Sequence, residues 1–245
     1  MGNEEAAPVE SPIRLVGVHV PQPWNVVSPK VVRYENEEWI EAFFDDGSLR
    51  LTSFKKFATY GDEARGDAME GFGSPLGFTN SGQTIGVVMR QGMDAYVLCA
   101  SHRLDEALRV EFERNSAFLI VDPVGFGLSI ASVLPGFMYG FEGSCRYAAE
   151  RGIRRRINAD MEAYRQPDGS ISMDFMQSVG AQLGGPELML LKRKKYTAQQ
   201  EYRLVWMTHG EAQEHIDIKC PDARQFCRRL LPLDWNPELA LKLDN

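Results

Sequence analysis

The chain has 245 residues, of which 44% are hydrophobic and 25% are charged, and its formal net charge at pH 7 is −7. These proportions are typical of a globular protein in water, and the negative charge argues against one that coats nucleic acid over its whole surface. No apolar run approaches the ~20 residues that a membrane-spanning helix needs, and the N-terminus lacks the apolar core of a secretory signal. We therefore expect a cytoplasmic protein that makes no membrane contact.

The spacing of cysteine and histidine predicts neither disulfides nor a metal site. No Cys-x-x-Cys pair occurs, and Cys220 and Cys227 lack histidines at the spacing of zinc ligands. The four histidines form no His-Glu-x-x-His motif. We expect reduced thiols and no bound metal.

Hydrophobic periodicity predicts a chain in which strands and helices are mixed. An acidic tail over residues 1–12 is expected to be disordered, and residues 13–245 are expected to form one domain. The expected strands are residues 13–20, 31–34, 49–53, 95–101, 117–121, 201–207 and 215–219. The expected helices are residues 36–46, 104–113, 174–183 and 221–231, and Gly47 is expected to end the first of them. Residues 124–134 are expected to form a helix or an irregular amphipathic stretch, and residues 136–143 a turn. The order of these elements predicts an α+β fold with a mixed, mostly antiparallel sheet.

The stretch from Leu188 to Met207 joins two apolar runs through a polar centre. In the second run Glu201 and Arg203 fall on one face of the expected strand, because side chains alternate between the two faces. A carboxylate is thereby held beside its own counter-ion at the mouth of an apolar strand. The pattern fits an ion pair at the edge of a strand, and it also fits a carboxylate that faces a cleft.

A series of short motifs precedes and completes this stretch. In chain order they are Arg33-Tyr34, the helix 36–46, Leu51-Thr52-Ser53, the acidic loop Asp67–Glu70, Cys99-Ala100-Ser101, and Lys192, Tyr196, Gln199, Glu201 and Arg203. In this order the chain resembles a widespread family of bacterial and phage proteins catalogued as a domain of unknown function. The resemblance covers the chain from about Val31 to Met207. It departs from the family in the acidic loop, which reads Arg-Gly-Asp-Ala-Met-Glu where the family usually has Asn-Asp-Pro before its Glu.

The same plan resembles the ADP-ribosyltransferase superfamily, whose members carry a catalytic glutamate in a Gln-x-Glu or Glu-x-Glu motif. This resemblance implies an ADP-ribosyltransferase-like fold and an enzyme that cleaves NAD and transfers ADP-ribose. Glu201 would stabilise the positive charge that develops on the ribose as nicotinamide leaves. Gln199 would orient the acceptor.

The resemblance also implies which residues bind NAD and the acceptor. Arg33 would hold the pyrophosphate by paired hydrogen bonds, and Arg203 would keep Glu201 ionised. Either Ser53 or Ser101 would support the glutamate or the nicotinamide ribose. The whole implied NAD-binding set is Arg33, Tyr34, Ser53, Ser101 and Arg203, and the implied substrate-binding set is Arg65, Asp67, Glu70 and Tyr196.

The implied partners are NAD, an acceptor that is a protein or a nucleic acid, and an inhibitory protein of the kind that toxins or phage-defence enzymes of this class require. Two other classes stay open. A non-catalytic interaction protein could contact phosphates through the basic runs 151–156 and 192–195. A nuclease could hold Mg²⁺ through Asp62, Asp67 and Glu70.

Overall fold

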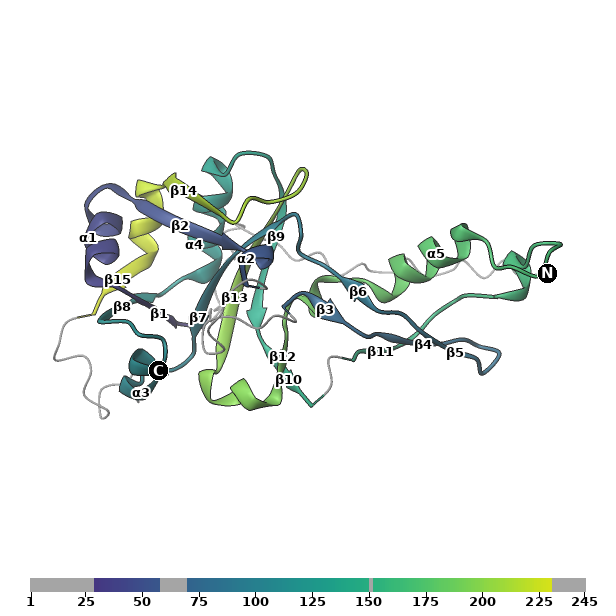
Figure 1. Ribbon diagram of the computed structural model, residues 1–245. Coiled ribbons are helices and arrows are strands. Elements are labelled where there is room, and N and C mark those ends of the chain that lie inside the picture. Colours follow the sequence, from purple (N-terminus) through teal and green to yellow (C-terminus); the bar gives the residue numbers. More distant parts are fainter. Residues whose placement is uncertain (1–28, 58–69, 150–151, 231–245) are drawn as a thin grey trace, which may run out of the picture.

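The pairing of strands in one large sheet determines this fold. The computed structural model describes residues 29–57, 70–149 and 152–230. The expected tail 1–12 and the expected strand 13–20 lie outside these ranges. The described chain has a mixed α+β fold with a sheet-rich body and a mostly antiparallel sheet, as the sequence predicts (Figure 1). Within the described ranges no helix is both long enough and apolar enough to cross a membrane.

The large sheet is built around one central strand. Its strands are β1 (Val31–Glu35), β2 (Ser48–Ser53), β7 (Ala95–Ser101), β8 (Ser116–Ile120), β9 (Phe137–Ser144), β13 (Glu201–Thr208), β14 (His215–Lys219) and β15 (Cys227–Arg229). One edge of β7 pairs with β13 along its whole length, and β9 continues the sheet beyond β13. The other edge is shared, because β2 pairs with it at Val97 whereas β1 pairs with it at Ser101. The sheet therefore forks at β7, with β14 beyond β2 on one branch and β8 and β15 beyond β1 on the other.

The described chain contains five helices and four 3-10 turns. The helices are α1 (Glu37–Asp46), α2 (Phe54–Phe57), α3 (Glu106–Glu111), α4 (Pro123–Val133) and α5 (Met173–Leu183), and the 3-10 turns are η1 (Glu162–Tyr164), η2 (Pro186–Leu188), η3 (Lys194–Gln199) and η4 (Pro221–Phe226). Helix α1 ends at Gly47, as the sequence predicts, in a left-handed conformation with φ of 80°. An added Cβ there would lie 2.4 Å from the backbone nitrogen of Pro221, so the close approach of η4 also requires glycine.

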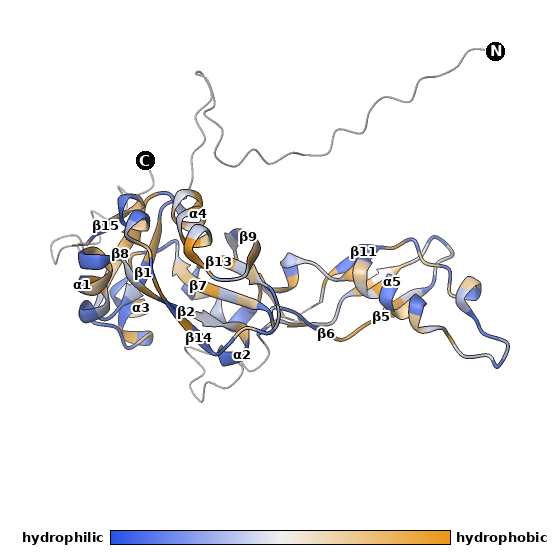
Figure 2. Ribbon diagram, turned by 90° about the horizontal axis from the view of Figure 1, so that it is seen from above, coloured by the Kyte–Doolittle hydropathy of each residue, from blue (hydrophilic) through white to orange (hydrophobic). Residues whose placement is uncertain are grey.

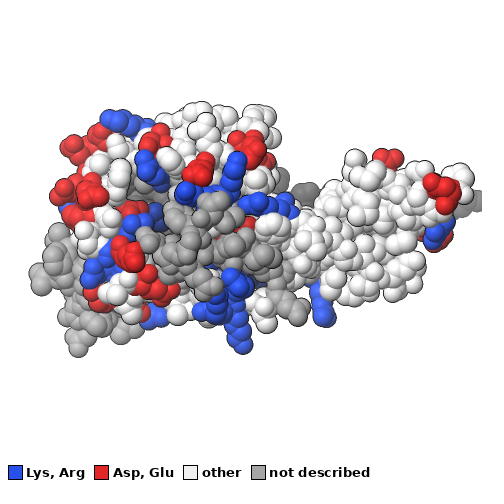
Figure 3. All heavy atoms as spheres, viewed as in Figure 1, with Lys and Arg blue, Asp and Glu red and all other residues white. Residues whose placement is uncertain are grey.

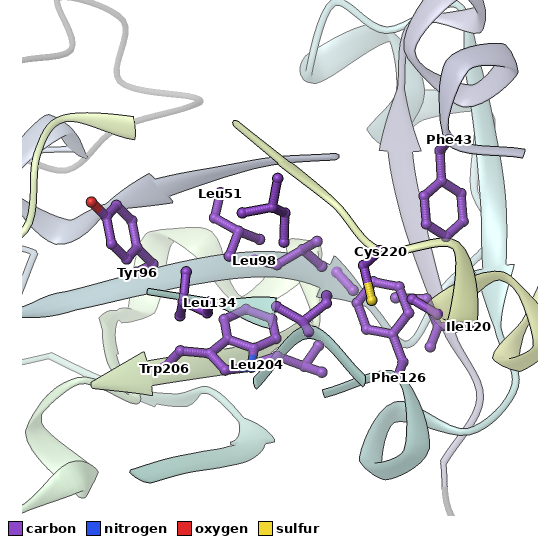
Figure 4. Close-up of a cluster of buried hydrophobic side chains, with 14 of the residues drawn as sticks. Phe43, Leu51, Tyr96, Leu98, Ile120, Phe126, Leu134, Leu204, Trp206 and Cys220 are labelled. Carbon is purple, nitrogen blue, oxygen red and sulfur yellow. The ribbon is translucent and has the colours of Figure 1, made fainter. Parts of the chain in front are cut away.

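The main core lies against one face of β7 and β13 (Figure 4). Leu98 of β7 and Leu204 and Trp206 of β13 point into it, and α1, α4 and η4 close it from outside. The indole nitrogen of Trp206 donates a hydrogen bond to the Gly127 carbonyl, 2.9 Å away, so the one polar atom of this side chain is satisfied. The side chains on the opposite face of the same two strands do not belong to the main core.

A second group of elements projects from the body as an arm, visible in both ribbon views (Figure 1, Figure 2). The arm contains β3 (Phe72–Gly73), β4 (Leu76–Phe78), β5 (Thr84–Gly86), β6 (Met89–Arg90), β11 (Arg154–Arg156), η1 and α5. It has a hydrophobic core of its own, centred on Ile157, Phe175, Val179 and Leu183. Two short strands, β10 (Arg146–Ala148) and β12 (Leu191–Arg193), pair in parallel where the chain leaves for the arm and returns. Charged side chains gather on the body, whereas the arm surface in this view is mostly uncharged (Figure 3).

Two expected elements are wrong. Residues 136–143 form strand β9 and not a turn, because they pair with the outer edge of β13. Gly140 suits this pairing, since an added Cβ would lie 2.9 Å from the Val205 carbonyl oxygen. The expected helix 221–231 is a 3-10 turn as far as Phe226, and its continuation pairs with β8 as strand β15. In both cases an unpaired strand edge outweighed the local pattern.

Candidate functional site

A cavity of about 120 Å³ lies at the fork of the sheet, where β1 and β2 separate along β7. Most of the residues expected from the sequence line it: Arg33, Tyr34, Glu70, Gln199, Glu201 and Arg203. They come from segments as distant in sequence as β1 and β13, and the fold brings them to one cavity. We call this space the first cavity.

Glu201 is the first residue of β13 and lies directly opposite Ser101 of β7. Its carboxylate is 7% exposed and accepts hydrogen bonds from two cations, Lys192 at Oε2 and Arg203 at Oε1. Burial alone would raise the pKa of Glu201, but the charges of Arg203 and Lys192 outweigh burial and hold that pKa well below its usual range. The carboxylate therefore stays ionised in a site that excludes most water.

Arg203 joins a second carboxylate to the first. Its guanidinium is 1% exposed and binds Glu70 through two parallel hydrogen bonds of 2.8 and 2.9 Å. The same group donates to the Met189 carbonyl, 2.6 Å away. Arg203, Lys192, Glu70 and Glu201 thus form a buried cluster of two cations and two anions, which we call the charge cluster. Paired geometry of this kind is what allows buried charges to persist.

Lys192 fixes the orientation of Gln199 as well as that of Glu201. The Lys192 ammonium donates a hydrogen bond to Gln199 Oε1 at 2.7 Å, so the amide nitrogen of Gln199 points away from Lys192. This amide nitrogen donates a hydrogen bond to Glu111 Oε1 at 2.7 Å. Burial alone would lower the pKa of Lys192, but the charge of Glu201 outweighs it and raises that pKa above its ordinary value. Gln199 is therefore held between a buried cation and a carboxylate on α3.

The turn that presents Gln199 and Glu201 depends on one of the two candidate serines. Gln200 adopts a left-handed conformation with φ of 41°, which turns the chain from η3 into β13. The Ser101 hydroxyl donates to the Gln199 carbonyl at 2.8 Å and supports this turn. Ser53 does not line the first cavity, and its hydroxyl donates to the Glu214 carbonyl at 3.2 Å. Of the two serines, Ser101 is the one beside the glutamate.

Two arginines share one carboxylate at the edge of the first cavity. Arg33 donates to Glu35 Oε2 and to the Cys99 carbonyl, both at 2.8 Å. Arg114 Nε lies 3.2 Å from Glu35 Oε1. Among the described residues one anion thus serves two cations here, and one positive charge is left in excess. We call Arg33, Glu35 and Arg114 the arginine pair site.

A second cavity, of about 200 Å³, adjoins the first. The two share Arg33, Thr52 and Arg114 as lining residues, so the arginine pair site separates them. The second cavity lies between α1, β2 and β8, and its aromatic lining residues are Trp39, Phe43 and Phe118.

The two expected tyrosines differ in their relation to the first cavity. Tyr34 lines the first cavity, but its hydroxyl donates to the Arg103 carbonyl at 2.7 Å and accepts from Asp105 N at 2.8 Å. Tyr196 is 7% exposed and does not line the cavity, and its hydroxyl has no hydrogen-bond partner among the described residues. Arg65 and Asp67, with Asp62 of the possible magnesium site, lie outside the described residues.

Neither a metal nor a thiol provides an alternative centre in the described part of the chain. No group of three or more His, Cys, Asp or Glu side chains there is arranged to hold a metal ion. All four cysteines are free. Cys99 lines the first cavity, and burial raises the pKa of its thiol to about 12, so it stays protonated and is a poor nucleophile at neutral pH.

Sequence reasoning did not place Lys192 or Arg114 beside Glu201 and Arg33. Lys192 stood in the motif and in the basic run 192–195, and its place before Glu201 is the sequence signal for their contact. Glu35 follows Arg33 by two residues on a strand, and the sequence offers Glu35, Glu37 and Glu38 as possible partners of Arg33. Arg114 carries no such signal, because it reaches the site only through the pairing of β8 with β1.

The chain matches no protein-family model, no curated protein and no solved structure.

Proposed function

We propose that this protein cleaves NAD and transfers ADP-ribose to an acceptor, with Glu201 as the catalytic carboxylate. The observation that carries the proposal is a buried carboxylate, paired with two cations, at the wall of a cavity that is also lined by two arginines sharing one carboxylate. NAD has the complementary form, because its reacting ribose becomes cationic as nicotinamide leaves and its diphosphate is anionic. The charges therefore suit both parts of the substrate.

Cleavage of NAD is favoured by a fixed negative charge beside the ribose. The bond between ribose C1′ and the nicotinamide nitrogen breaks with its electron pair going to nicotinamide, which leaves as a neutral molecule. The positive charge then resides on the ribose, where a preorganised carboxylate in a water-poor site stabilises it most. A nucleophile of the acceptor bonds to C1′ and loses its proton to solvent.

The charge cluster leaves Glu201 able to do this. Lys192 and Arg203 each occupy one acceptor position on one carboxylate oxygen, and a carboxylate offers about four such positions. The remaining positions are available to a ribose hydroxyl. The two cations hold the carboxylate in place, so no reorganisation is needed when charge develops. Gln199, fixed by Lys192, would help to orient the acceptor.

The test is nicotinamide release from NAD by the purified full chain, with cell extract supplied as the source of acceptor. We expect Glu201→Gln to lower the rate by about 10²- to 10³-fold. The matched control is Glu211→Gln, the same chemical change at a surface residue that pairs with Lys55, and its rate should stay within about twofold of wild type. Equal folding of both variants is checked by circular dichroism. Nicotinamide release by Glu201→Gln at the wild-type rate would overturn the proposal. The absence of both NAD binding and NAD cleavage by the wild-type chain would overturn it as well.

Binding to nucleic-acid phosphates has less support in the described residues. Lys192 is buried against Glu201 and adds nothing to a surface patch. Arg155 donates to the carbonyls of Gln182 and Gly184, at 3.2 and 3.0 Å, within the arm. A steep loss of nucleic-acid binding as salt rises would restore this alternative.

A further inference from the structure

We propose that the second cavity binds the adenine nucleotide half of the substrate, with the base against Trp39 and the diphosphate on Arg33 and Arg114. This inference rests on the proposed function, because it assigns the end of NAD that does not react. Its basis is the order of three features along one space: the first cavity, the arginine pair site and the second cavity.

Charge balance places the anionic part of the ligand. In the charge cluster two cations meet two anions, and Arg50 is matched by Asp217 through hydrogen bonds of 2.6 and 2.7 Å. At the arginine pair site Arg33 and Arg114 share Glu35, so among the residues that line the two cavities the excess positive charge lies there. Guanidinium groups bind phosphate by paired hydrogen bonds. A diphosphate at this point would lie between the two cavities.

The lining of the second cavity suits a planar aromatic ring. The buried Phe43 and Phe118 rings stack on each other with centroids 5.2 Å apart and form part of the cavity lining, so the ring exposed to a base is that of Trp39. Trp39 is 45% exposed, and the Arg50 guanidinium lies 5.4 Å from the centre of its ring. Asp217 holds that guanidinium in place. A base can stack on such an aromatic surface whatever its identity, at about 1–3 kcal/mol per base.

Trp39 is exposed although it belongs to a helix that packs on the main core. Helix α1 buries Ile40 and Phe43 in the main core, whereas Trp39 is turned outward over the second cavity. A large aromatic side chain that the core does not use, beside a cavity and an arginine, is the arrangement that binds nucleobases by stacking.

The experiment measures binding of three probes by isothermal titration calorimetry with the full chain: ADP, adenosine and inorganic diphosphate. We expect ADP to bind at least about tenfold more tightly than either fragment, because only ADP occupies both features. We expect Trp39→Leu to weaken ADP about 5- to 150-fold and to leave diphosphate unchanged. Arg114→Gln should weaken both ADP and diphosphate. The control Tyr139→Leu changes another exposed aromatic residue, 53% exposed on β9, and should change neither.

The outcomes separate this inference from the proposed function. If NAD is cleaved while Trp39→Leu alters neither ADP affinity nor the KM for NAD, the second cavity is not the adenine site and the proposed function stands. If ADP binds with the expected dependence on Trp39 and Arg114 but NAD is never cleaved, the nucleotide site stands and the proposed function fails. No binding of ADP by the wild-type chain overturns the inference.

Discussion

The two faces of strand β13 differ although they share one backbone. On one face Tyr202, Leu204 and Trp206 are buried in the main core with apolar neighbours. On the other face Glu201 and Arg203 are equally buried but carry charges. The charges are confined to the half of the strand beside the fork, because Val205 and Met207 further along the same face pack in an apolar cluster.

The apolar face and the charged face of β13 contribute differently to the stability of the fold. Burying Leu204 stabilises the body directly, by removing apolar surface from water. A buried ion pair seldom does so, because desolvation offsets the attraction between the charges, and apolar residues of similar volume often serve as well. The fold alone gives no reason for four charged side chains at the fork, whereas a reaction that develops charge does.

The largest effect is expected from Arg203→Met, which keeps the volume and removes the charge. Glu70 would lose the paired hydrogen bonds from Arg203 and Glu201 would lose one of its two cations, so we expect the free energy of unfolding to fall by about 3–5 kcal/mol. Urea denaturation of the full chain measures this change. Leu204→Ala, on the apolar face, should cost about 2–5 kcal/mol by creating a cavity.

The two losses have different causes, and a third substitution tells them apart. Adding Glu70→Gln removes the buried carboxylate that has lost its two hydrogen bonds from Arg203, so it should recover about 0.5–3 kcal/mol in that background. In the Leu204→Ala background it should add to the loss. The distinction between the faces is wrong if Glu70→Gln has one and the same effect in both backgrounds.

A smaller effect is expected from pH. The pKa of Glu201 is lowered in the folded chain, so its contribution to stability is complete above the ordinary carboxyl pKa of about 4.3 and is lost as pH falls through the folded value. The unfolded chain takes up a proton first, and the contribution should decline by about 1.4 kcal/mol per pH unit below about pH 4.

Glu201→Gln cannot show this decline, which makes it the reference. We expect urea unfolding to give the free energy of unfolding of both proteins between about pH 7 and about pH 3. The difference between the two free energies should be constant near neutral pH and should become smaller in acid. A difference that is independent of pH over this range would mean that the carboxylate has its ordinary pKa in the folded chain. The description of the charge cluster would then be wrong.

Local patterns predicted much of the body but not the fork. The alternation from Glu201 to Trp206 placed these six side chains on the correct faces of β13, and Gly47 ended α1 as expected. Nothing in either segment states that β1 and β2 pair with the same edge of β7, since that depends on the whole sheet. For the same reason Glu70 could be assigned to the acceptor but not to Arg203, which lies 133 residues further along the chain.

The arm shows a second limit of sequence patterns. The helix α5 was expected from its own apolar periodicity, but its partners Ile85 and Ile157 come from segments on either side of the central strands. Each segment is too short to signal a separate core. The glycine-rich β9 was mistaken for a turn because its extended form is favoured only once β13 offers an edge.

The smallest effect is expected from Tyr196→Phe, and it compares two hydroxyl groups. The buried Tyr196 hydroxyl has no hydrogen-bond partner among the described residues, while Lys192 and Lys195 lie 4.8 and 5.0 Å from the centre of its ring. Removing an unpaired buried hydroxyl should leave the free energy of unfolding unchanged or raise it by up to about 1 kcal/mol. The ring remains and still contacts both cations.

Tyr34→Phe is the matched control, because the Tyr34 hydroxyl bonds Arg103 O and Asp105 N. Its loss should cost about 1–2 kcal/mol, since both backbone groups lose a partner. Thermal unfolding of the two variants measures the contrast. If Tyr196→Phe costs as much as Tyr34→Phe, the Tyr196 hydroxyl is hydrogen-bonded in the folded protein. That bond would then act together with the contact between its ring and the two lysines.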